Sequence, residues 1–213
     1  MRSRFSMFVV LLMAASPLFG SHGAPMPQVD PKNEAVNSYN DGLRYRDRAW
    51  GYEKELAAAT DPAKRTKLEE QIRKTYAADV RCQRAAIKNN SQLFQAYSEL
   101  GYALRKSGDY PGALEAYDKA LALMPNYAEA IEYRGEAFLG LDRVGDAREA
   151  YLLLFNGGDR NNAGLLATAM TKWVDQRRAN PGSLPAQKID EFGTWLTQRK
   201  EISHETAAGG TWH

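Results

Sequence analysis

Residues 93–130 read LFQAYSELGYALRKSGDYPGALEAYDKALALMPNYAEA, and this stretch decides the fold. Small and aromatic residues recur in it at the spacing of a helix face. The pattern then repeats, because Leu100-Gly101 aligns with Arg134-Gly135 at a shift of 34 residues. A fixed period of this length is typical of stacked helical hairpins, since one hairpin cannot bury its own apolar face.

Glycine and alanine occupy matching places in the two units. Gly101 with Ala113, and Gly135 with Ala147, are expected to let the two helices of each hairpin approach closely. Larger side chains at these places would push the helices apart.

Turn signals separate the helices within each unit. Gly108-Asp109 and Gly145-Asp146 each combine a glycine, which favours a helix end, with an aspartate, which favours a helix start. We therefore expect both pairs to lie between helices. Pro125 is expected to stop the second helix of the first unit.

The first unit, residues 94–127, resembles the tetratricopeptide (TPR) repeat, and the second, residues 128–161, follows in phase. The resemblance implies an all-α protein, a short right-handed superhelix of about eight helices in antiparallel hairpins, with a concave face. The signature positions of the first unit hold Tyr97, Leu100, Gly101, Leu104, Ala113, Tyr117, Ala120 and Pro125; the second keeps Gly135, Phe138, Ala147 and Tyr151.

The flanks depart from this repeat, as the ends of a stack must. Residues 34–93 are predicted to form a degenerate, enlarged N-terminal hairpin. Its first helix, residues 34–59, is expected to bury an apolar stripe, and its second to start at Thr60-Asp61-Pro62. The stripe is Val36, Tyr39, Leu43 and Trp50.

At the other end, residues 162–205 are predicted to form a capping hairpin. Trp173, Phe192 and Trp195 are expected to pack its two helices together. Residues 206–213 are expected to be a flexible tail.

The chain begins like a secretory signal peptide. Arg2 and Arg4 precede an apolar run that is shorter than the roughly 20 residues of a membrane span. Small residues at Ser21 and Gly23 suit cleavage there, which makes residues 1–23 a leader and residues 24–33 a linker. We expect secretion across the inner membrane into the periplasm; a cytosolic protein with an apolar start and an uncleaved anchor remain alternatives.

Charge and cysteine content exclude some classes of protein. The net charge of +2 includes Arg2 and Arg4, so the chain without its leader is balanced and gives no argument for nucleic-acid binding. Cys82 is the only cysteine, so no internal disulfide exists. It is interpreted as a small buried helix residue, with a reactive thiol or an intermolecular bridge as the alternative.

In proteins similar to this one, the first helix of each hairpin lines a groove that holds a partner peptide. Three glutamates of the second unit share a helix face, and we expect them to form an acidic wall that attracts a basic partner segment. An ordinary solvated helix face is the alternative. The predicted groove residues are Gln95, Ser98, Tyr102, Arg105, Lys106, Glu129, Glu132 and Glu136, with Leu139 and Gly140 beside them.

These features favour an exported protein–protein interaction module, an adaptor or scaffold in bacterial envelope assembly. A self-associating structural protein, built by stacking of terminal hairpins, is the alternative. The basic helix of residues 62–89 offers a second surface, for an acidic partner or for anionic lipid headgroups, unless it is a solvated face.

Signals of catalysis are weak. The sequence has no glycine-rich phosphate loop, no histidine pair at helical spacing and no cysteine cluster, so we expect no enzyme, no cofactor and no metal. A thiol–imidazole pair of Cys82 and His204 would require the fold to join distant hairpins.

Overall fold

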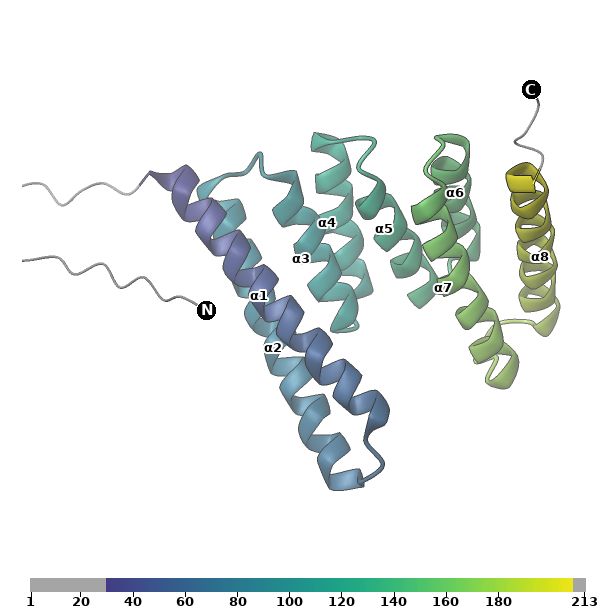
Figure 1. Cartoon of the computed structure of the whole chain (residues 1–213), viewed down its shortest axis with the longest axis horizontal. Helices are drawn as coiled ribbons and strands as arrows, with labels where there is room; N and C mark the ends of the chain where they lie inside the picture. The colour runs from purple at the N-terminus through teal and green to yellow at the C-terminus, as the bar shows by residue number, and fades with distance from the viewer. Residues whose placement is uncertain (1–29, 209–213) are drawn as a thin grey trace, which may run out of the picture.

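The computed structural model describes residues 30–208, and these residues form eight α-helices and no strand (Figure 1). Each helix packs against the next along the chain. The predicted all-α array of hairpins is therefore confirmed, while the predicted leader, residues 1–23, lies outside the described part of the chain. The helices are α1 (Pro31–Ala58), α2 (Pro62–Asn89), α3 (Phe94–Lys106), α4 (Tyr110–Leu123), α5 (Ala128–Gly140), α6 (Val144–Asn156), α7 (Arg160–Ala179) and α8 (Ala186–Ala208).

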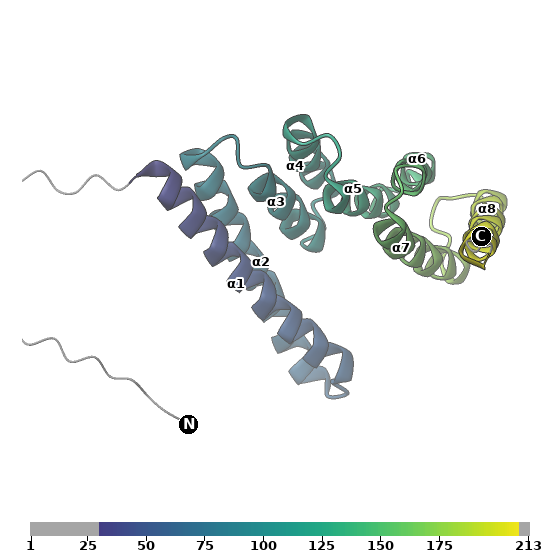
Figure 2. The same ribbon diagram turned by 45° about the horizontal axis from the view of Figure 1, so that its top comes forward.

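The first helices of the four hairpins share one side of the array. In addition to the contacts between consecutive helices, α1 contacts α3, α3 contacts α5, and α5 contacts α7. Figure 2 shows the hairpins following one another from α1–α2 to α7–α8. The helices α1, α3, α5 and α7 therefore form what we call the inner side of the array.

The first hairpin is the longest and packs along small residues. Its helices have 28 residues each, whereas α3 and α5 have 13, so its loop end extends beyond the neighbouring helices (Figure 1). The buried residues of α1 are Ala35, Gly42 and Ala49, seven positions apart, a spacing that keeps them on one helix face. We call this line of small residues the α1 seam.

The apolar stripe predicted for this helix is wrong. Val36 and Trp50 are 48% and 42% exposed, and Tyr39 and Leu43 are only partly buried. Hydrophobic periodicity favours large side chains, but a close helix pair buries its small ones.

In the repeats, the predicted glycines do allow close approach, but the facing residues differ from those expected. A Cβ atom at Gly101 would lie 2.6 Å from the ring of Tyr117, and one at Gly135 would lie 2.6 Å from Leu166 of α7. Ala113 and Ala147 are fully buried, as predicted, without being the nearest neighbours of these glycines.

One predicted turn is confirmed and the other is wrong. Gly108 adopts a positive φ of 84°, and the Asp109 side chain caps α4 by accepting the amide hydrogen of Gly112. Gly145-Asp146, in contrast, lies inside α6. The equivalent turn is formed three residues earlier by Asp142, which has a φ of 58° although it is not glycine.

The last hairpin is held by aromatic rings, as predicted. Trp173 of α7 meets Phe192 of α8 edge-on at 5.6 Å between ring centroids, and Phe192 stacks on Trp195 at 5.7 Å. The predicted tail begins too early, because α8 continues to Ala208.

Candidate functional site

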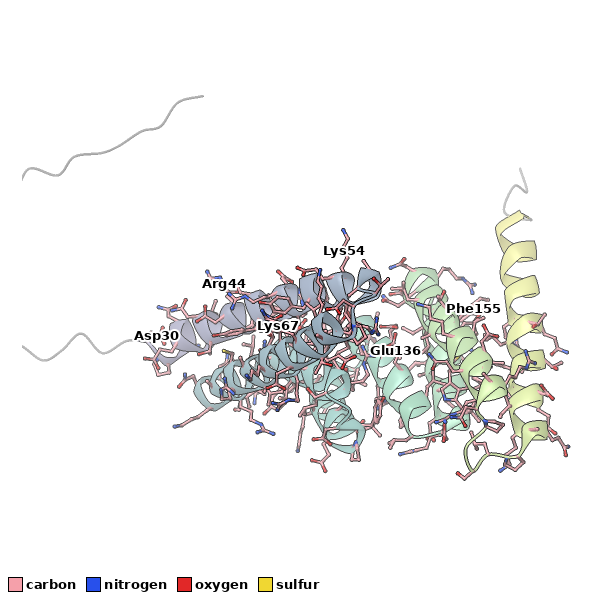
Figure 3. The ribbon with its side chains drawn as sticks, turned by 90° about the horizontal axis from the view of Figure 1, so that it is seen from below. Asp30, Arg44, Lys54, Lys67, Glu136 and Phe155 are labelled. Carbon is pink, nitrogen blue, oxygen red and sulfur yellow. The ribbon has the colours of Figure 1, made fainter. Side chains whose placement is uncertain are left out.

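An open cavity of about 910 Å³ lies on the inner side of the array, and we call it the inner cleft. Its walls come from α1, α3, α5 and α7, with Tyr110 contributed by the start of α4. With 28 and 20 residues, α1 and α7 extend past the ends of α3 and α5 (Figure 1). Residues of both longer helices line the cleft. Figure 3 shows the molecule from below, with Glu136 drawn between the first hairpin and the later helices.

The inner cleft contains part of the predicted groove. Five of the predicted residues line it, and so do Leu139 and Gly140. Six of these seven lie toward the C-terminal ends of α3 and α5, where the overhanging helices enclose space, and Glu132 lies near the middle of α5. The five are Tyr102, Arg105, Lys106, Glu132 and Glu136.

The other three predicted residues do not line the cleft. Gln95 and Glu129 lie in the first turn of their helices, and a 13-residue helix is about 20 Å long, so they are distant from the C-terminal ends. Ser98 is 2% exposed and cannot contact a ligand without rearrangement.

The α1 wall is made by Trp50 and Glu53, which sequence reasoning did not place in the groove. The Trp50 indole N–H donates to the hydroxyl of Tyr102 at 2.6 Å. Glu53 forms an ion pair with Lys106 at 2.8 Å and accepts a hydrogen bond from Tyr76 at 2.9 Å. These contacts fix the first hairpin against α3. Trp50 stays 42% exposed and presents an apolar surface to the cleft.

The floor of the cleft holds two carboxyl groups and one guanidinium. Arg105 pairs with Glu136 and lies over the rings of Tyr102 and Tyr133, 5.1 and 5.4 Å from their centroids. Glu132, one turn before Glu136, is only 2% exposed. Burial, together with the charge of Glu136 and a hydrogen bond to it, holds the pKa of Glu132 well above its usual range, although Arg105 acts against this.

The predicted acidic wall is therefore not formed as expected. Of its three glutamates, Glu136 is neutralised by Arg105, Glu132 is buried and favours its neutral form, and Glu129 lies outside the cleft. The cleft is mixed in charge.

The opposite wall is α7, which sequence reasoning did not select. Leu165 is 53% exposed there, next to Ala169 and Trp173. Lys172 also lines the cleft and has no ion pair within residues 30–199. Arg177 pairs with Asp142 at 2.6 Å, which ties α7 to the α5–α6 turn. A signal for this wall did exist, because Leu165 and Trp173 lie eight residues apart, about two helical turns.

The basic helix, α2, is partly neutralised by its own acids. Glu70 pairs with Arg73 at 2.7 Å and with Lys74 at 3.1 Å. Arg65 donates to the carbonyl of Ala59 at 3.0 Å and so helps to close the α1–α2 loop. In the described part of the chain, no helix combines the length and the apolar character of a membrane span.

The residues considered for catalysis are not brought together. Cys82 lies on α2 in the first hairpin and is half-buried rather than fully buried as expected; burial raises the pKa of its thiol. His204 belongs to α8, at the other end of the array (Figure 1). Within the described residues, no group of three histidine, cysteine or acidic side chains is placed to hold a metal ion.

A comparison with protein families finds a TPR repeat at residues 101–142, from the middle of α3 to the turn after α5. This match covers the segment in which the predicted repeat continues from one unit into the next. No curated protein matches the chain. The chain thus contains a TPR repeat, and TPR repeats are modules that bind proteins.

Proposed function

We propose that the protein is an adaptor whose inner cleft holds a segment of a partner protein. The observation that carries this proposal is the pair of exposed apolar side chains, Trp50 and Leu165, on opposite walls of one cavity. Large apolar side chains in a concave site are the usual anchors of binding. A volume of about 910 Å³ accommodates several side chains of an extended or helical segment.

The walls that carry these anchors are fixed before a partner binds. The hydrogen bond from Trp50 to Tyr102 and the ion pair between Glu53 and Lys106 join α1 to α3. The ion pair between Arg177 and Asp142 fixes α7. A preformed site loses less conformational entropy on binding, so modest contacts suffice for a stable complex.

The floor of the cleft favours a basic side chain on the partner. Two carboxyl groups, Glu132 and Glu136, face the guanidinium of Arg105 there. If both were ionised, one negative charge would have no partner, and this charge is absent while Glu132 keeps its proton. A lysine or arginine of the partner that reaches Glu136 at the floor brings a second positive charge close to the buried Glu132 and lowers its pKa. Binding of a basic segment is then expected to release a proton and to strengthen as the pH rises through the raised pKa of Glu132.

Site-specific photocrosslinking tests the location of the surface. A photoreactive amino acid replaces Leu165 in the cleft, Lys67 on the basic helix, or Leu153, which is 52% exposed on α6 away from the cleft. The proposal expects one partner crosslinked from position 165 and from neither other position. A crosslink from position 67 alone would move the binding surface to α2. A crosslinked second copy of the chain would support self-association.

Export is part of the proposal and is tested separately. We propose that the leader directs the chain out of the cytoplasm, to a role in the assembly of a bacterial envelope. The support is the arrangement of charge, apolar run and small residues before Ala24. N-terminal sequencing of the protein from cells is expected to begin near Ala24, and a retained Met1 would contradict export by this route.

A further inference from the structure

A second cluster of polar groups is buried where α1, α2 and α3 meet, away from the inner cleft. Asp79 and Gln83 lie one turn apart on α2, and both are fully buried. The Gln83 side-chain amide donates to Asp79 Oδ1 at 3.0 Å and to the backbone carbonyl of Tyr39 at 3.4 Å. Two oxygens of the same pair, Asp79 Oδ2 and Gln83 Oε1, have no hydrogen-bond partner within residues 30–199.

The protonation state of Asp79 decides whether these two oxygens are satisfied. An ionised carboxylate only accepts hydrogen bonds, and so does the amide oxygen of glutamine. With Asp79 ionised, both atoms stay unpaired in the interior, which is costly. A neutral carboxyl group has one O–H donor. A neutral acid can complement an amide, since the amide N–H donates to one acid oxygen and the acid O–H is free to donate to the amide oxygen.

Charged groups of α1 and α3 act on the carboxyl group of Asp79. On α1, Arg46 donates to Glu99 of α3 at 2.7 Å and contacts Asp47 at 3.2 Å, so its guanidinium is not directed to Asp79. Burial raises the pKa of Asp79 to about 7. The hydrogen bond from Gln83 and the charge of Arg46 lower the pKa, whereas the charges of Glu99 and Asp47 raise it.

Two further titratable groups lie near Asp79. Tyr39 of α1 and Cys82 of α2 both have a pKa raised mainly by burial and additionally by the charge of Asp79. Neither supplies a positive charge that would stabilise an ionised Asp79. Arg46 is the cation that lowers the pKa of Asp79, and it is already paired with Glu99; Arg81 of α2 acts on Cys82.

The backbone of α1 is shaped to accept this pair. A Cβ atom at Gly42 would lie 2.0 Å from Gln83 Nε2 and 2.7 Å from Asp79 Oδ1. The missing side chain at the centre of the α1 seam thus provides the space in which the acid and the amide lie.

We propose that Asp79 is protonated in the folded chain and forms a closed acid–amide pair with Gln83, which makes the packing of the first hairpin sensitive to pH. When the proton leaves to solvent, a buried carboxylate remains with one oxygen that has no donor, and the contact between α1 and α2 weakens. Because α1 carries Trp50 and Glu53, the same proton controls one wall of the inner cleft; this last step rests on the proposed function.

The direction of the effect follows from the raised pKa. The folded chain holds its proton up to about pH 7, whereas an unfolded aspartate releases it near 3.8. The contribution of Asp79 to stability is therefore complete below pH 3.8. It is lost as the pH rises from 3.8 to about 7, and over this range the folding equilibrium constant decreases by at most about tenfold per pH unit.

Urea unfolding of the whole protein between pH 4 and pH 8 tests the proposal with three chains: the parent, Asp79→Asn, and the control Asp175→Asn at an exposed position of α7. Asparagine has the shape of a protonated aspartate, and its side-chain N–H is a hydrogen-bond donor at every pH of the experiment. The parent and the control are expected to lose stability over this range, and Asp79→Asn to lose markedly less. The same pH dependence in all three chains would overturn the proposal.

Carbon-13 NMR of the Asp79 carboxyl group in the parent chain gives a readout that does not depend on any variant. A titration midpoint near 7 is expected, and a midpoint near 3.8 would overturn the proposal.

Hydrogen exchange then tests the hairpin. The intrinsic exchange rate of every amide rises with pH. At pH 8, amides of α1 and α2 are expected to exchange faster than this intrinsic increase explains, whereas amides of α5 serve as the reference. Neither result requires a partner, so a failure of the proposed function leaves this test intact.

Discussion

The first hairpin and the tandem repeats both bring two helices close together, but with different residues. In the first repeat, Gly101 lies against the ring of Tyr117, so one helix supplies the space and the other fills it. In the first hairpin, the space at Gly42 is filled by a polar pair, Asp79 and Gln83. At this position the repeat fills the space with an aromatic ring, whereas the first hairpin fills it with a hydrogen-bonded polar pair and thereby adds a requirement for a proton.

The packing of the repeat is tested by overfilling it. Ala113 of α4 is fully buried, and Ala113→Trp is expected to force α3 and α4 apart, at a cost of about 3 kcal/mol of unfolding free energy or more. Ala122→Trp, at an exposed position of the same helix, is the control and is expected to change stability little. Thermal unfolding measures both. Equal melting temperatures for Ala113→Trp and the parent chain would show that the register of the hairpin is wrong.

The packing of the first hairpin is tested at two glycines of one helix. Gly42→Ala places a methyl group where Gln83 lies, and we expect a loss of about 1–3 kcal/mol from overpacking. Gly51 has nothing within 4 Å of the added methyl, so Gly51→Ala is expected to gain about 0.5–1 kcal/mol from the reduced freedom of the backbone. Urea unfolding compares the two, and the same sign of change in both would contradict the α1 seam.

Substitutions in the turns of the two repeats are expected to change the free energy of unfolding least. Gly108 has a positive φ, and Gly108→Ala is expected to cost about 1 kcal/mol. Gly145 lies inside α6 with free space around it, so Gly145→Ala is expected to stabilise by about 0.5–1 kcal/mol. Destabilisation by Gly145→Ala in thermal unfolding would mean that the turn lies at Gly145-Asp146 after all.

The sequence predicted the repeats well because each of their residues has an equivalent one period away. Gly101 and Tyr117 are recognisable from that period, whereas the Gly108-Asp109 turn is recognisable from its own residues, because Asp142 and Arg143 stand at the equivalent positions. The second turn was misplaced because Asp142 adopts a left-handed conformation without being glycine. Aspartate tolerates this conformation better than most residues, so no glycine signal was needed there.

The inner cleft was predicted only in part, for a geometric reason. It lies where α1 and α7 extend past the shorter α3 and α5, and helix lengths across separate hairpins are not a periodic property of the sequence. Residues at the wrong end of a helix, such as Gln95 and Glu129, were therefore included. Trp50 was assigned to a buried stripe, and Leu165 was not selected.

Two substitutions of the same kind test the central claim, that the inner cleft is the binding surface, most directly. Leu165 and Leu153 are similarly exposed, 53% and 52%, but only Leu165 lines the cleft. The affinity of the crosslinked partner segment for Leu165→Ala and for Leu153→Ala is measured by calorimetry. We expect Leu165→Ala to lose about 1.5 kcal/mol, close to tenfold in Kd, and Leu153→Ala to bind like the parent chain. Equal affinities for the two variants would contradict the assignment of function to the inner cleft.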